Sequence, residues 1–220
     1  MTVWKVFNAT YQWGGDNDLL LALTNGDDGE PPADVLIGVE GRTADNRPLP
    51  VARILGPGWQ VAQDTTSGAK AGSVIAVRNR SGIKVRWSLG QLMSRRGRSV
   101  QDRYRRVAAL DGLPVATRVA GIHNPLPKTG KQDEAVESTL RWVNRQRRRR
   151  RMQKRLRWAV AGDFNLNHNA MRTDLDMPHS FGADVMGFIY SEGWGELRFS
   201  ANKYDGTDHA VLTIISKEKA

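Results

Sequence analysis

Cysteine is absent from the 220-residue sequence. This absence excludes disulfide bridges, thiolate metal sites and a thiol nucleophile, and it fits a reducing compartment. Metal sites built from oxygen atoms remain possible. The sequence has no apolar run near the ~18 residues of a membrane span. Its N-terminal stretch MTVWKVFNAT lacks a charged region followed by a long apolar one. We therefore expect a cytoplasmic or otherwise intracellular protein with no signal peptide and no membrane partner.

Internal repeats and low-complexity linkers are also missing from the sequence. A chain of 220 residues, 40% of them hydrophobic, suits one sizeable core and is short for two domains of ordinary size. We expect a single domain that spans residues 1–220.

Acidic residues are nearly absent from two short stretches of a chain whose formal charge is +10. Residues 145–157 (RQRRRRRMQKRLR) hold eight Arg and one Lys without an acid, and residues 95–106 hold six Arg against one Asp. The rest of the chain has 18 basic and 22 acidic residues. Each stretch is compatible with an ordinary solvated face, but basic patches on an acidic remainder favour a polyanionic partner such as nucleic acid.

Strand-like and helix-like patterns alternate along the chain. Expected strands cover residues 2–10, 33–41, 73–79, 83–89, 103–110, 115–123, 157–162, 184–191 and 209–216, and expected helices cover 18–26 and 131–151. The longer helix has an apolar stripe of Val136, Leu140 and Val143, with acids near its start and arginines near its end. We expect strands 73–79 and 83–89 to form a hairpin, and likewise strands 103–110 and 115–123. Strand pairs with helices between some of them predict an α/β or α+β sandwich.

Polar side chains stand where the expected apolar strands begin or end. They are Asn8, Glu40, His123, Asp163, Asn165, Asp184, Asp208 and His209. One carboxylate at a strand end is usually an ordinary cap or turn residue. A set of carboxylates, amides and imidazoles of this kind instead indicates a site that binds a hard metal or moves protons. We also expect these strand-end side chains to be exposed, and so to contribute little to packing.

Several short motifs resemble the endonuclease/exonuclease/phosphatase superfamily, which has the deoxyribonuclease I-like and apurinic-endonuclease-like fold. The motif GDFN (residues 162–165), followed about forty residues later by TDH (207–209), is similar to two of its signatures. FNAT, VLIGVEG and GIHNP resemble the family's strands that end in Asn, a metal-binding Glu and a catalytic His. ADVMGFIYS stands where the family has a strand with an Asp. The resemblance covers nearly the whole chain and implies a four-layer sandwich, with two packed, mostly antiparallel sheets flanked by helices.

The resemblance also implies a role for each of these residues. Glu40 is the expected ligand of Mg²⁺ or Mn²⁺, with Asn8 and Asp208 in or near the metal shell. Asp163 would orient or deprotonate the attacking water, and Asn165 would steady Asp163 or a phosphate oxygen. His209, held by Asp184, would stay cationic and donate to the scissile phosphate.

His123 departs from the family pattern. Nucleases of the deoxyribonuclease I type orient the matching His with a Glu on an earlier strand. The corresponding stretch here, SGAKAGSVIAV, offers Lys70 and no acid. We therefore expect His123 to be unpaired and to act only as a phosphate donor.

The two basic stretches are expected at different distances from the site. Residues 147–151 (Arg147, Arg148, Arg149, Arg150 and Arg151) precede the strand that ends in Asp163, so we expect this patch at the opposite end, about 20 Å away. The anion that binds this patch is expected to come from nucleic acid, from an acidic protein surface or from solvent counterions. Antiparallel pairing of strands 103–110 and 115–123 would instead bring Arg103, Tyr104 and Arg105 back toward His123, where they could grip a nucleic-acid backbone.

Three functions are compatible with these features. The first is a divalent-metal-dependent phosphodiesterase, a hydrolase that nicks DNA with low sequence specificity. The second is a phosphoesterase acting on a small-molecule or lipid phosphate. The third is a nucleic-acid-binding protein on a decayed catalytic frame. The two basic stretches favour the DNA endonuclease.

Overall fold

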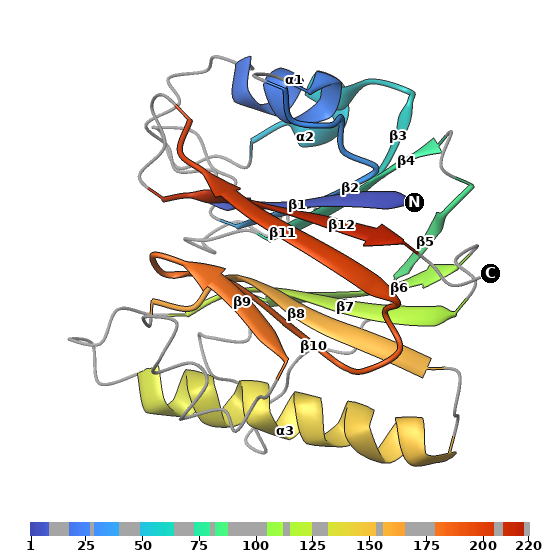
Figure 1. Ribbon diagram of the computed structural model, residues 1–220, viewed down its shortest axis with the longest axis vertical. Coiled ribbons are helices and arrows are strands. Elements are labelled where there is room, and N and C mark those ends of the chain that lie inside the picture. Colours follow the sequence, from blue (N-terminus) through green and yellow to red (C-terminus); the bar gives the residue numbers. More distant parts are fainter. Residues whose placement is uncertain are drawn as a thin grey trace.

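Two six-stranded sheets lie face to face between helices, and together they make four layers (Figure 1). The computed structural model describes residues 1–8, 18–26, 29–39, 49–63, 73–79, 82–87, 105–111, 115–124, 132–152, 156–165, 179–204 and 209–217. In the view of Figure 1, α1 and α2 cover the upper sheet, and α3 lies below the lower sheet. This arrangement is the predicted four-layer sandwich.

The strands are ordered differently in space than along the chain. The upper sheet runs β11 (Glu196–Asn202), β12 (Val211–Lys217), β1 (Thr2–Asn8), β2 (Val35–Val39), β4 (Val74–Arg78) and β3 (Trp59–Gln63). The lower sheet runs β5 (Lys84–Trp87), β6 (Arg105–Asp111), β7 (Ala116–His123), β8 (Leu156–Asp163), β10 (Met186–Tyr190) and β9 (Ser180–Ala183). The helices among the described residues are α1 (Asp18–Asn25), α2 (Val51–Leu55) and α3 (Gln132–Met152).

Each sheet has one parallel pair at its centre, and the other described strand pairs are antiparallel. In the upper sheet β1 runs parallel to β2, which places Asn8 opposite Val39. In the lower sheet β7 runs parallel to β8, which places His123 opposite Asp163. Parallel neighbours end at the same edge of their sheet, so these registers bring the polar residues at the strand ends together.

Three apolar clusters of described residues lie between the four layers. The largest lies between the sheets and includes Trp4, Ile37 and Phe188. A second joins the lower sheet to α3 through Trp142 and Trp158, and a third joins the upper sheet to α1 and α2. Because both faces of each sheet are covered, β1 and β8 are buried along their whole length rather than alternating between buried and exposed residues. Full burial of a Leu or Phe side chain stabilises the fold by about 1.5–3 kcal/mol.

A buried arginine lies at the start of β8, where the apolar pattern would not predict one. The Arg157 side chain is fully buried, and its Nε donates to Thr117 Oγ1 at 2.7 Å. The Arg157 guanidinium also lies 4.4 Å from the centroid of the Trp194 ring, a cation–π contact. Arg157 is therefore a structural member of the basic stretch 145–157 and is not available to a partner.

The predicted hairpin of strands 73–79 and 83–89 is wrong. β4 pairs with β2 and β3 in the upper sheet, whereas β5 pairs with β6 in the lower one. The chain therefore crosses between the sheets at the turn where a hairpin was expected. The second predicted hairpin is present, because β6 and β7 pair antiparallel with Arg105 opposite Ile122.

No helix among the described residues is long and apolar enough to cross a membrane.

Candidate active site

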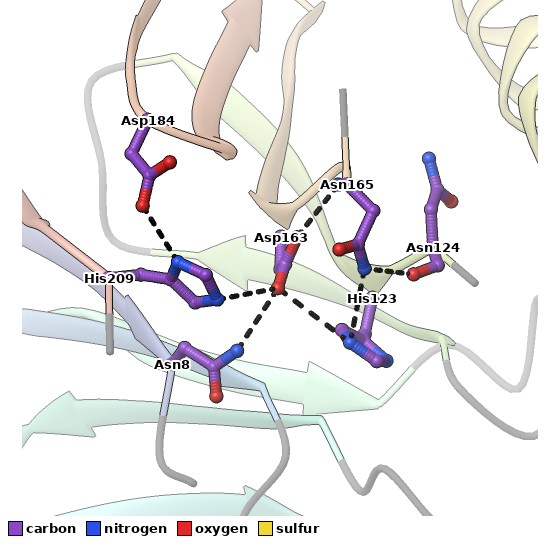
Figure 2. Close-up of polar contacts among 7 residues, drawn as sticks. All are labelled: Asn8, His123, Asn124, Asp163, Asn165, Asp184 and His209. Atoms are coloured by element: carbon purple, nitrogen blue, oxygen red, sulfur yellow. Dashed lines mark hydrogen bonds and ion pairs between the residues drawn. The ribbon is translucent and has the colours of Figure 1, made fainter. Parts of the chain in front are cut away.

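Asp163 lies at the centre of a group of polar side chains drawn from both sheets (Figure 2). Its Oδ2 accepts a hydrogen bond from Asn8 Nδ2 at 3.1 Å, across the interface between the sheets. The same oxygen lies 3.7 Å from Nε2 of His123 and 3.7 Å from Nε2 of His209. The carboxylate thus has an imidazole nitrogen on either side and an amide donor from the upper sheet.

His209 is held on its other side by Asp184. His209 Nδ1 lies 2.8 Å from Asp184 Oδ2, a hydrogen-bond distance with the carboxylate oxygen as acceptor. The His209 side chain is 25% exposed and that of His123 is 16% exposed, whereas Asp163 as a whole residue is only 1% exposed. The two imidazoles and the more exposed Asp184 side chain are therefore open to an incoming substrate, whereas the Asp163 carboxylate is buried.

The backbone around Asp163 is built to hold its carboxylate in place. Asn165 N donates to Asp163 Oδ1 at 2.7 Å, in a tight turn that places Asn165 at φ 49°. Asn tolerates this left-handed conformation better than most residues. The Asn165 side chain donates from Nδ2 to the Asn124 carbonyl and lies 3.5 Å from His123 Nε2. The turn therefore positions both Asp163 and Asn124, the residue that follows β7.

Gly162 permits the close approach of β8 to β7 at this point. Its φ is 138°, and a Cβ at this position would lie 2.0 Å from the Ile122 carbonyl oxygen. An L-residue with a side chain would therefore both strain the backbone and clash with it. The glycine of GDFN is therefore needed for structure, because it permits the register that sets His123 beside Asp163.

Asn8 presents an oxygen that could bind a cation. Asn8 is 4% exposed, and its Oδ1 has no hydrogen-bond partner among the described residues. An unpaired buried amide oxygen costs about 1–3 kcal/mol unless a donor or a cation satisfies it. Within the described part of the chain, no cluster of three or more Asp, Glu or His side chains forms a metal site. Glu40, the residue after β2, and Asp208, the residue before His209, lie outside the described residues.

The last two residues of the basic stretch 95–106 belong to β6, whose backbone runs beside the strand that ends in His123. Arg105 opens β6 and pairs with Ile122, one residue before His123. Arg103 and Tyr104, together with Lys70, fall outside the described residues, and so does the side chain of Arg105. The predicted return of this strand toward the active end is therefore present, while the grip on a substrate stays a prediction.

Helix α3, which carries Arg147 to Arg151 near its C-terminal end, ends far from Asp163, as predicted. Arg150 Nη2 lies 3.2 Å from Glu192 Oε2, just after β10. β10 runs antiparallel to β8, and Tyr190 near that end pairs with Ala159. Residues 147–151 therefore lie beside the N-terminal end of β8, whereas Asp163 ends the same strand.

Sequence comparison finds neither a family model nor a curated protein that matches this chain. Structure comparison does find matches. An endonuclease/exonuclease/phosphatase from Bacteroides vulgatus superposes with a TM-score of 0.65 at 10% identity, over 99% of this chain and 99% of that one. The chain has the endonuclease/exonuclease/phosphatase fold.

Two further solved structures share this fold. The endonuclease domain of TRAS1, a telomere-specific non-LTR retrotransposon, superposes with a TM-score of 0.59 at 14% identity, over 100% of both chains. The 3′ phosphatase NExo from Neisseria, bound to a product DNA hairpin, superposes with a TM-score of 0.61 at 14% identity, over 99% of this chain and 100% of that one. Nucleases and phosphatases, one of them bound to DNA, therefore use the same architecture.

Within the endonuclease/exonuclease/phosphatase fold of this chain, two expectations about the site are wrong. His123 is not unpaired, because its Nε2 lies 3.7 Å from Asp163 Oδ2. Asp163 is buried rather than exposed, since both sheets close over it. Asp184 also differs in detail. It lies in the two-residue turn between β9 and β10 at φ 56°, and β10 begins only at Met186.

Asn124 is a site residue that the motifs did not single out. Its backbone N donates to the Asp163 carbonyl at 2.8 Å, and its own carbonyl accepts from the Asn165 side chain. The pair His123-Asn124 in GIHNP was the available signal, because a polar residue that directly follows a strand-end His lies at the same end of the sheet.

Proposed function

We propose that the chain is a divalent-metal-dependent phosphodiesterase that nicks DNA with little sequence preference. One observation carries the proposal. Asn8, His123, Asp163, Asn165, Asp184 and His209 converge from both sheets on one end of the sandwich. This set combines a buried carboxylate, two partly exposed imidazoles and an amide oxygen that has no partner among the described residues. Hydrolysis of a phosphodiester needs such groups to activate water and to offset negative charge, because the phosphodiester is an anion that resists attack by another anion.

Each residue of the set has a proposed role in hydrolysis. Asp163 orients or deprotonates the water that attacks phosphorus, and the Asn165 backbone fixes the direction of its carboxylate. His209, steadied by Asp184, donates to the scissile phosphate as the P–O bond breaks. His123 donates to a second phosphate oxygen.

Asn8, Glu40 and Asp208 are the proposed ligands of the cation. Asn8 Oδ1, which has no partner within the described part of the chain, fits this role, because a hard cation prefers amide and carboxylate oxygens. When bound, Mg²⁺ or Mn²⁺ supplies charge neutralisation on the phosphate. The low sequence preference follows from a grip on phosphates by Arg103, Tyr104 and Arg105, since phosphate contacts carry no base information.

A plasmid assay tests the proposed function. Purified protein with Mg²⁺ should convert supercoiled plasmid to the nicked circle, and a chelator should stop the conversion. A His209→Ala sample prepared in parallel controls for contaminating nucleases. Cleavage of a small phosphodiester such as bis(p-nitrophenyl) phosphate without plasmid nicking would point to a small-molecule substrate instead. Nicking that survives the chelator would contradict the metal requirement.

Glu40→Gln should raise the Mg²⁺ concentration for half-maximal nicking by about tenfold or more, because a neutral amide binds the cation more weakly than a carboxylate. Asn8→Ala should act in the same direction. Glu196→Gln is the matched control, because Glu196 is an exposed carboxylate at the start of β11. An unchanged Mg²⁺ titration in Glu40→Gln would remove Glu40 from the metal site.

Replacing Arg103 and Arg105 by Gln should lower kcat/KM on DNA and flatten its dependence on salt. Each lost phosphate contact removes about 0.9 from the slope of log K against log salt, so the slope should fall by about two. A variant that replaces Arg53 and Arg198 by Gln loses the same charge at exposed positions on other elements. Equal salt slopes in the two variants would show that residues 103–105 do not touch the backbone.

A further inference from the structure

The outer side of α3 carries arginines that the proposed hydrolysis does not use. The inner side of the helix is fixed against β8, because Trp142, Val143 and Gln146 are all at most 3% exposed. Arg145, Arg148, Arg149 and Arg151 are exposed on the remaining surface. Their spacing places them within about 9 Å along the helix axis. We call these four residues the α3 arginine surface.

The α3 arginine surface is not neutralised within the described part of the chain. Acids do pair with neighbouring arginines, since Glu137 pairs with Arg141 and Glu192 pairs with Arg150. No described Asp or Glu pairs with any of the four. The positive charge of this surface also acts on β7. The pKa of Arg118 is lowered mainly by burial and, to a smaller extent, by the charge of Arg149. Four like charges are therefore held together without a described counter-charge.

Helix stability alone does not explain this arrangement. Cations near a helix C-terminus gain about 0.3–1 kcal/mol from the helix dipole, but the effect fades beyond the last turn. Arg149 and Arg151 lie in the last turn of α3, whereas Arg145 does not. Like charges spaced at i,i+4 on a helix, such as Arg145 and Arg149, cost a few tenths of a kcal/mol. An external anion would offset this repulsion.

The composition of the surface favours nucleic acid over protein as the source of that anion. A protein partner would need an apolar centre on this surface. Among the described residues, Met152 is the only exposed large apolar residue beside the four arginines. Protein–nucleic acid interfaces are instead polar and strongly positive. Guanidinium groups also match the oxygens of a phosphate in bidentate geometry.

We propose that the α3 arginine surface is a second, non-catalytic binding site for the phosphate backbone of duplex DNA. It lies beside the start of β8, and Asp163 ends that strand seven residues later, so about 23 Å separates the two sites. A duplex of a few base pairs cannot occupy both, whereas a long duplex can. The surface therefore tethers the protein to long DNA and raises the local concentration of scissile phosphates. This inference rests on the proposed function for the choice of DNA.

A binding experiment tests the second site without requiring cleavage. The protein carries His209→Ala in a buffer with chelator, and fluorescence anisotropy follows a labelled 40-base-pair duplex at two salt concentrations. One variant replaces the four arginines of the α3 arginine surface by Gln. The control variant replaces Arg53, Lys84, Arg198 and Lys217 by Gln, which removes the same charge from exposed positions on four other elements. Thermal unfolding verifies that both variants are folded.

The α3 variant should bind the duplex at least about tenfold more weakly at low salt, and its slope of log K against log salt should fall by about 3.6 if each of the four arginines contacts one phosphate. The control variant should stay within about threefold of the parent protein. Equal losses in both variants, or an unchanged α3 variant, would overturn the proposal. Tighter binding of the parent protein to polyglutamate than to the duplex would also overturn it, in favour of an acidic protein partner. Plasmid nicking by the wild-type protein reports separately on the proposed hydrolysis.

Discussion

Asp163→Asn should lower plasmid nicking by at least about a thousandfold at saturating Mg²⁺. The substitution keeps the size of the side chain but removes its charge and its basicity, and general-base catalysis alone contributes about 10²–10⁴ in rate. It also weakens the cluster, because Asn8 Nδ2 and Asn165 N both donate to this one carboxylate. An amide cannot accept from both on its two terminal atoms. The nicking rate of the purified variant measures the effect.

Burial makes a control for stability necessary in this experiment. Asp163→Asn is expected to cost about 1–3 kcal/mol, because a buried donor loses its partner. Asp34 is a matched control, since its Oδ2 accepts a partly buried hydrogen bond from Val3 N at 3.0 Å and has no proposed role in the site. Asp34→Asn should lower the melting temperature while nicking stays within about threefold. Nicking by Asp163→Asn within tenfold of the wild-type rate would remove this carboxylate from the mechanism.

His209→Ala should be as inactive as Asp163→Asn but should leave the fold stable, because His209 is partly exposed and its described polar contacts are to Asp184 and Asp163. The pair of variants therefore separates a chemical loss from a structural one. Retained nicking by His209→Ala would leave the proton donor to be found elsewhere.

Gly162→Ala should destabilise the protein by more than about 3 kcal/mol. The added Cβ would lie 2.0 Å from the Ile122 carbonyl oxygen, and the φ of 138° is rarely adopted by residues with a side chain. The clash involves the backbone of β7, so β7 and β8 must separate beside His123 and Asp163. Urea unfolding measures the loss of stability, and nicking should fall with it.

Gly58→Ala is the matched control for this substitution. A Cβ at Gly58 meets no atom within 4 Å, so its effect on the free energy of unfolding should be below about 1 kcal/mol. If Gly162→Ala unfolds at the same urea concentration as Gly58→Ala, the close approach of the two strands is not a requirement of the fold.

Buried central strands and the long helix were predictable because their patterns are strong. β1, β2, β7, β8 and β12 are mostly apolar and mostly buried, since layers cover them on both sides. Three strands gave no clear signal, and all of them lie at sheet edges: β3, β9 and β11. Their residues are mostly half-buried, so their apolar periodicity is weak. The five-residue helix α2 is too short for a periodic pattern.

The candidate site shows the same division between local and long-range information. By itself the sequence determined which residues end the buried strands, because a polar side chain after an apolar run is a local feature. Tertiary structure alone decided that Asn8 donates to Asp163 across 155 residues of sequence, and that Asp163 is buried between two imidazoles. It also decided that β4 and β5 belong to different sheets. The physical reason is that strand pairing and layer packing depend on which apolar faces meet, and each face is compatible with several partners until the whole chain is folded.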